Sequence, residues 1–159
     1  MRGTSTISAN GEYRYLLGRT WEKGLSVAWI MLNPSTADAS QDDPTIRKCV
    51  EFSKRLGFGG MTVVNLYALR STKPKKLWKH PDPIGNNNHH IKQAALAADM
   101  VVCAWGANPK SVERGRTVYA MLKDWNIRPY CLGTTKNGSP KHPLYVPYKT
   151  TFKRFRGVK

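Results

Sequence analysis

Short apolar segments alternate along the chain with segments whose apolar residues recur at helical spacing. Continuous apolar runs of strand length are typical of strands buried on both faces of a sheet. They predict strands at 26–32, 61–67, 99–105 and 129–133. Apolar residues that recur three and four positions apart predict helices over 44–56 and over 111–124. A further helix is predicted from residues 91, 94, 95 and 98, which would share one face. This order favours a three-layer α/β/α fold whose four-stranded sheet is parallel, with helices on both of its faces.

The remaining segments fit one domain over residues 1–159. Residues 1–25 form an N-terminal extension that we expect to add a strand or hairpin, because residues 13–17 nearly alternate between apolar and polar. Residues 73–87 are rich in proline and lysine and predict a loop, and 149–159 form a basic tail. Neither an internal repeat nor a linker interrupts the chain.

Candidate site residues follow the predicted strands, because ligands of open α/β sheets bind outside the carboxyl ends of the strands. These polar or turn-forming residues are Asn33, Pro34, Ser35, Asp38 and Asp42 after the first strand, Asn65 and Tyr67 at the end of the second, and His142 after the fourth. Each has a simpler interpretation. Residues 33–38 can form an ordinary strand-ending turn, and a histidine in a basic loop is most often solvated. Asn65 is harder to dismiss, since an amide that closes a buried strand must find partners.

Charge points to a polyanionic partner. The chain carries 26 Lys and Arg against 10 Asp and Glu, a formal charge of +16, which makes nucleic acid the leading partner class. The excess is concentrated in 70–80 and from residue 136 onward. We expect backbone contacts from the basic residues of these segments, Arg70, Lys73, Lys75, Lys76, Lys136 and Lys141.

Several classes are excluded or disfavoured. No apolar run approaches the roughly 20 residues of a membrane helix, so no membrane partner is expected. The polar N-terminus does not resemble a secretory signal, which favours a cytoplasmic protein. Three widely spaced cysteines fit buried reduced thiols better than disulfides or a metal site. Neither neighbouring histidines nor the acids at 38, 42 and 43 form a convincing ligand set, so no metal is expected.

Longer motifs carry two resemblances. Nearly the whole chain resembles a domain-of-unknown-function family of small bacterial and phage proteins. The motifs are Met31-Leu-Asn-Pro-Ser-Thr-Ala-Asp38, Asp42-Asp-Pro-Thr-Ile-Arg47, Val64-Asn-Leu-Tyr67, Ala104-Trp-Gly106 and 132–145. More distantly, their order is similar to that of the uracil-DNA glycosylase superfamily. That resemblance implies parallel strands in the order 2-1-3-4. It also implies that Asn33 positions the attacking water, that Asn65 reads a flipped base, and that His142 stabilises the departing base.

The glycosylase resemblance predicts an enzyme that hydrolyses the N-glycosidic bond of a flipped base in DNA. Under this hypothesis we expect Tyr67, Pro34 and Ser35 also to contact the base, and Asp38 and Asp42 to lie near the water or to have structural roles. The reaction requires no cofactor or metal. Met31-Leu32 replaces the superfamily's usual glycine, and 142–146 departs from its histidine loop. We therefore expect the target to be a modified base. We also expect the protein to be a monomer. Two alternatives remain: a non-catalytic nucleic-acid-binding module, and an enzyme that acts on free nucleosides or nucleotides.

Overall fold

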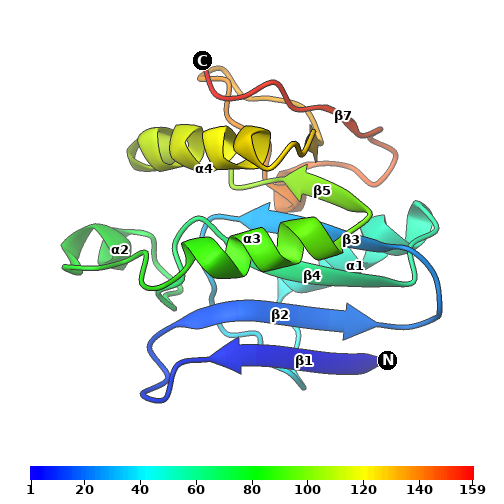
Figure 1. Cartoon of the computed structure of the whole chain (residues 1–159), viewed down its shortest axis with the longest axis horizontal. Helices are drawn as coiled ribbons and strands as arrows, with labels where there is room; N and C mark the ends of the chain where they lie inside the picture. Colours follow the sequence, from blue (N-terminus) through cyan, green and yellow to red (C-terminus); the bar gives the residue numbers. More distant parts are fainter.

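A seven-stranded mixed sheet runs through the molecule (Figure 1). The computed structural model describes residues 1–159. The strands are β1 (Arg2–Ile7), β2 (Arg14–Thr20), β3 (Ser26–Met31), β4 (Gly60–Asn65), β5 (Met100–Cys103), β6 (Tyr130–Cys131) and β7 (Lys153–Arg154). Their spatial order is β1-β2-β4-β3-β5-β6-β7. β4, β3, β5 and β6 are parallel neighbours, whereas β1 pairs antiparallel with β2, β2 with β4, and β7 with β6.

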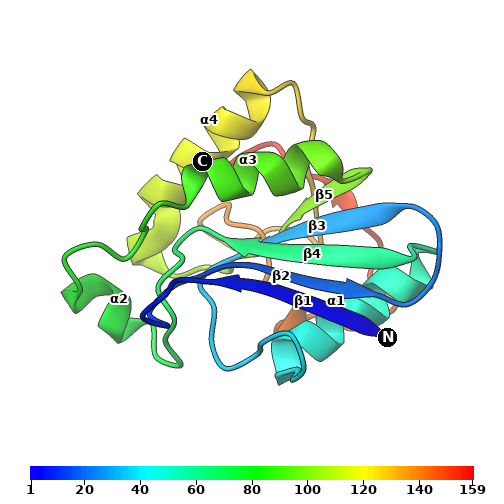
Figure 2. The ribbon, with the colours of Figure 1, turned by 60° about the horizontal axis from the view of Figure 1, so that its bottom comes forward.

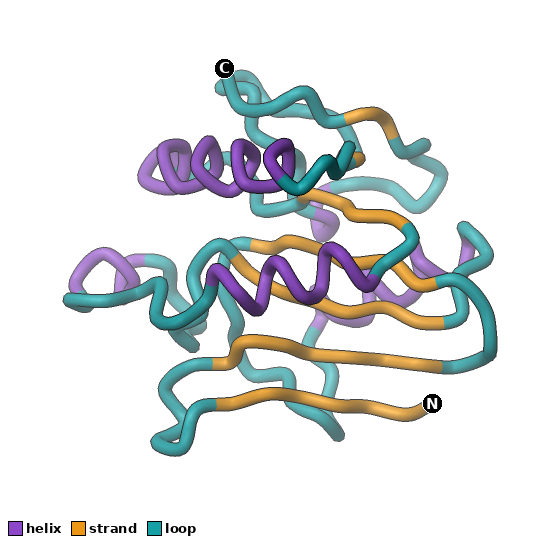
Figure 3. Tube along the Cα trace, in the orientation of Figure 1, coloured by secondary structure: helices purple, strands orange, loops and turns teal.

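Helices cover both faces of this sheet (Figures 2 and 3). α1 (Pro44–Arg55) packs on one face, and α3 (Asn88–Ala97) and α4 (Val112–Asp124) pack on the other. A short helix, α2 (Lys75–Lys79), lies in the connection between β4 and α3. Two 3₁₀ turns, η1 (Pro109–Ser111) and η2 (Pro143–Tyr145), follow β5 and β6. The connections after the parallel strands therefore gather at one end of the sheet.

The central strand β3 supplies side chains to two separate cores. Ala28 and Ile30 belong to the core beneath α3 and α4, whereas Val27, Trp29 and Met31 belong to the core beneath α1. Successive side chains of a strand point to opposite faces, and here both faces are covered. This burial explains why the sequence of β3 is continuously apolar rather than alternating.

The predicted mixed α/β class is confirmed, but the sheet is wider than the four strands expected from the sequence. Residues 1–25 contribute the hairpin β1–β2 to one edge, and the basic tail contributes β7 to the other. The prediction of a loop over 73–87 is wrong at α2, where Leu77 is fully buried and anchors the helix to the core. All three cysteines are buried and free, as expected.

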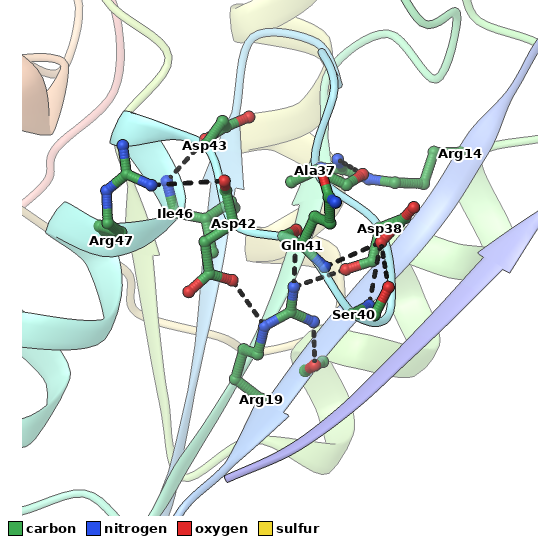
Figure 4. Close-up of polar contacts among 11 residues, drawn as sticks. Arg14, Arg19, Ala37, Asp38, Ser40, Gln41, Asp42, Asp43, Ile46 and Arg47 are labelled. Carbon is green, nitrogen blue, oxygen red and sulfur yellow. Dashed lines mark hydrogen bonds and ion pairs between the residues drawn. The ribbon is translucent and has the colours of Figure 1, made fainter.

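A β-bulge in the hairpin positions one side chain for the site described below. The pairing of β1 with β2 passes from Thr6↔Leu16 to Ile7↔Arg14, which leaves Tyr15 without a counterpart. An extra residue of this kind reverses the inside–outside alternation of the strand. Arg14 consequently lies on the same side of the sheet as Arg19, toward the loop that precedes α1 (Figure 4).

We expect Trp29→Ala to lower the free energy of unfolding by about 3–5 kcal/mol, because it empties a large, fully buried site in the core beneath α1. The Trp29 indole also donates to Ser53 Oγ at 3.0 Å. Trp29→Phe retains a ring and should cost less. Urea titrations of the two variants check this order, and equal losses would contradict it.

Candidate functional site

A pocket of about 420 Å³ opens at the carboxyl end of the parallel strands. Loops that follow all four of these strands contribute to its wall, and Arg14 enters from the hairpin. Four of the predicted site residues line it: Asn33, Ser35, Asn65 and His142. The structure therefore brings together side chains that are more than 100 positions apart in the sequence.

Asn65 closes β4 with a side chain that is only 2 % exposed. Neither Nδ2 nor Oδ1 has a hydrogen-bond partner within the protein. Its backbone carbonyl, in contrast, accepts a hydrogen bond from Asn87 Nδ2 at 2.6 Å. An unpaired buried polar group costs about 1–3 kcal/mol. The pocket thus presents a donor and an acceptor, side by side on one amide, that a ligand would satisfy.

Asn33 connects two of the loops that form the pocket. Its Nδ2 donates to the Ser71 carbonyl at 2.9 Å and to the Pro34 carbonyl at 3.0 Å. The Ser71 amide in turn donates to the Pro34 carbonyl at 2.9 Å. These bonds fix the orientation of the amide and leave Oδ1 as the acceptor available to a ligand or a water molecule.

His142 is held in one tautomer by the 3₁₀ turn η2. Its Nδ1 accepts a hydrogen bond from the Leu144 amide at 3.2 Å, so the neutral ring carries its proton on Nε2. Burial lowers the pKa of His142 to about 4, although the nearby Asp43 carboxylate opposes that shift. At neutral pH the imidazole is therefore an uncharged hydrogen-bond donor.

Two charged residues of the pocket were not predicted. Asp43 is recognisable in the sequence as the N-cap of α1, and its Oδ1 does accept from the Ile46 amide at 2.9 Å (Figure 4). It also lines the pocket. Arg14 is 2 % exposed and lines the pocket from β2. No sequence motif marks Arg14, which is the first residue of a strand that also contains Arg19.

Four predicted residues lie outside the pocket wall. Tyr67 belongs to the core beneath α3 and α4 and packs edge-to-face on Trp78, because the chain leaves the strand after Asn65. Pro34, in the loop after β3, is buried. Asp38 accepts from the Ser40 and Gln41 amides, which lower its pKa, and Asp42 pairs with Arg19 at 2.9 Å. Both acids are structural in this arrangement.

None of the basic residues named from the sequence lines this pocket. Lys75 instead borders a second hollow, of about 550 Å³, together with Lys79, Lys110 and Trp78. Asn108 belongs to both, so the hollow adjoins the pocket. Lys73, Lys76, Lys136 and Lys141 are exposed, and Arg70 is partly buried. The two ion pairs of the protein, Arg19–Asp42 and Arg55–Glu51, involve none of them.

Two further observations concern metal ions and membranes. No group of three or more His, Cys, Asp or Glu side chains is arranged to bind a metal ion. None of the helices combines the length with the apolar character that crossing a bilayer requires.

Comparison with known proteins places the chain in a family. The family model described as "Protein of unknown function (DUF1643)" matches residues 14–144. This range covers most of the chain and includes every residue that lines the pocket except Tyr145. The protein therefore belongs to the DUF1643 family. No curated protein and no solved structure matches the chain.

We expect Asn65→Leu to stabilise the ligand-free protein by about 1–2 kcal/mol, because leucine has a similar size and removes two buried polar atoms that lack partners. Urea unfolding measures this change. Asn87→Leu is the comparison: it removes the donor to the Asn65 carbonyl and should destabilise. A loss of stability in Asn65→Leu would contradict the assignment of an unpaired amide.

Stability should fall as the pH drops from about 6.5 toward 4. The unfolded chain binds a proton at His142 near its ordinary pKa of 6.5, whereas the folded protein resists protonation down to about 4. The free energy of unfolding therefore decreases as the pH falls through this window. Burial, followed by the neighbouring His89, also lowers the pKa of His90, which adds to the slope. Urea titrations at several pH values should show a shallower slope in His142→Asn, which retains a capping side chain, and an unchanged slope would contradict the shift.

Proposed function

We propose that this protein hydrolyses the N-glycosidic bond of a base flipped out of DNA. The observation that carries the proposal is the Asn65 amide, which is buried, unpaired at both polar atoms and in one pocket with Asn33 and His142. A nucleobase edge presents neighbouring donors and acceptors that match such an amide. The pocket volume of about 420 Å³ accommodates a base together with part of its sugar.

The leaving base is the centre of negative charge in this reaction. When the bond from C1′ to the base nitrogen breaks, the electron pair departs with the base and positive charge develops on the sugar. Donors aimed at the base lower the energy of that state. The Nε2–H group of His142 and the Nδ2 group of Asn65 are two uncharged donors on the pocket wall, and neither must change its protonation state.

Water completes the reaction by adding its oxygen to C1′. The Oδ1 atom of Asn33 is free to accept a hydrogen bond from that water, because Nδ2 of the same amide is bonded to the loop carbonyls. The proton that the water releases neutralises the departing base. The products are the free base and an abasic sugar, and the reaction consumes one water molecule.

Two features beside the pocket suit a nucleic-acid substrate. Leu144 and Tyr145, at 38 % and 84 % exposure, stand on its wall, where apolar side chains can fill the gap left by a flipped base. Val146, the next residue, is buried and is not available for this role. The adjoining hollow offers three lysines and the ring of Trp78 to a neighbouring phosphate and base.

The distant resemblance to uracil-DNA glycosylases is part of this proposal. Its support is the order of the parallel strands, β4-β3-β5-β6, with Asn65 at the end of β4 and Asn33 and His142 in the connections that follow β3 and β6. Met31 and Leu32 line the pocket where that superfamily commonly has glycine. Their bulk changes the shape offered to the base, so the proposed substrate is a modified base rather than uracil.

We expect the protein to release a base from one member of a panel of oligonucleotides that carry modified bases, offered as duplexes and as single strands. Alkali then breaks the strand at each abasic site, and chromatography identifies the free base. Asn33→Ala and His142→Asn should each reduce the rate by about 10²–10³, the usual cost of losing one positioned group. Thr36→Ala, an exposed change in the loop of Asn33, is the matched control.

Other outcomes separate the alternatives. Salt-dependent DNA binding without base release, unaffected by changes at Asn33 and His142, would identify a binding module and overturn the catalytic proposal. Release of a base from free nucleotides alone would replace DNA by a small-molecule substrate. In that case, neutralising Lys75 and Lys79 would leave the rate unchanged.

A further inference from the structure

Two arginines on strand β2 have similar burial but different surroundings (Figure 4). Arg19 is 3 % exposed and donates to Asp42 Oδ1 at 2.9 Å, to the Gly18 carbonyl at 2.9 Å and to the Gln41 carbonyl at 3.1 Å, and also to the Asp38 carbonyl. Arg14 is 2 % exposed and has one hydrogen bond, from Nη1 to the Ala37 carbonyl at 2.8 Å. Only Arg19 has a carboxylate partner.

The guanidinium of Arg14 faces the pocket with most of its donors unused. A guanidinium has five N–H groups, and the Nε of Arg14 is buried without any partner. Burial lowers the pKa of Arg14 to about 10, and the Asp43 carboxylate opposes this shift, so the group remains charged at neutral pH. A buried charge without a counter-ion is strongly unfavourable, and proteins rarely retain one without a functional reason.

The surrounding charges leave this cation uncompensated. Of the acids, Asp43 has the largest electrostatic effect on the pKa of Arg14. Asp43 nevertheless forms no ion pair with Arg14, and its side chain caps α1 instead. Asp38 has a weaker favourable effect, whereas Arg70 and Arg19 repel Arg14. The bulge at Tyr15 turns Arg14 toward the loop that precedes α1, where it bonds the Ala37 carbonyl. Bulges that redirect a side chain are common beside functional sites.

We propose that Arg14 is the receptor for an oxyanion, a phosphate or carboxylate group, carried by the ligand of the pocket. A planar guanidinium binds such groups through two parallel charge-assisted hydrogen bonds. This inference rests on the proposed function, in which the oxyanion is either the phosphate of the flipped nucleotide or an acidic substituent of its base. The unpaired amide of Asn65 then recognises the base within the same pocket.

Binding measurements with matched probe pairs test the inference. Deoxyuridine 5′-monophosphate is compared with deoxyuridine, and orotate with uracil, by calorimetry at constant ionic strength. We expect the charged member of one pair to bind at least about tenfold more tightly to the full-length protein, a difference of about 1.4 kcal/mol. The preferred pair identifies whether the oxyanion is a phosphate or a base carboxylate.

Variants assign the effect to Arg14. Arg14→Gln should abolish the preference, and Arg14→Lys should retain part of it, because lysine keeps the charge without the planar geometry. Arg47→Gln removes an exposed positive charge outside the pocket and should preserve the preference. A preference that survives in Arg14→Gln would overturn the assignment.

The wild-type protein tests the idea even where Arg14→Gln fails to fold. Inorganic phosphate or acetate should raise its melting temperature above the value in chloride at equal ionic strength. Equal binding within both probe pairs, without such a shift, would overturn the inference. Base release from DNA is scored separately, so an oxyanion preference without base release would reject the proposed function and keep the role of Arg14.

Discussion

The burial of β3 on both faces, combined with parallel pairing on both edges, is the constraint on which the rest of the molecule depends. Its register with β4 and with β5 fixes the carboxyl ends of these strands side by side. Polar groups that follow the strands must then meet at one place, because the faces of the sheet are occupied by helices. The pocket at this end follows from the packing of the core.

Two groups in the pocket that favour ligand binding lower the stability of the ligand-free protein. The Asn65 amide and the Arg14 guanidinium are buried without the partners that their burial demands. Other polar side chains near the pocket form hydrogen bonds within the protein: Asn33 joins two loops, Asp43 caps α1, and Arg19 holds the loop at 38–42 through several bonds. Four of the six buried side-chain atoms without a partner belong to the pocket residues Asn65, Arg14 and Trp105. This concentration favours a site for a polar ligand over ordinary packing defects scattered through the fold.

The sequence predicts the parts of this structure that arise from local patterns. Asn33, Asn65 and His142 stand at or after the ends of predicted strands, and all three line one pocket in the structure. Tyr67 lies outside the pocket wall, because the path of the chain beyond β4 depends on the packing of Tyr67 against Trp78, which periodicity does not encode. Arg14 was missed because its place depends on two long-range events, the antiparallel docking of β2 on β4 and the bulge at Tyr15. Leu77 shows the same limit in α2, where a tertiary contact overrides a proline-rich, lysine-rich sequence.

The hairpin has a consequence for how the protein is made. Arg14 is synthesised early, but its strand docks on β4, and the pocket also requires His142 near the other end of the chain. During translation, the early hairpin therefore waits for later strands before its polar and apolar faces are covered. Contacts that span such long stretches of sequence form slowly. The pocket is therefore complete only after the last part of the chain, which also supplies Val146 and Phe155 to the two cores, has been synthesised.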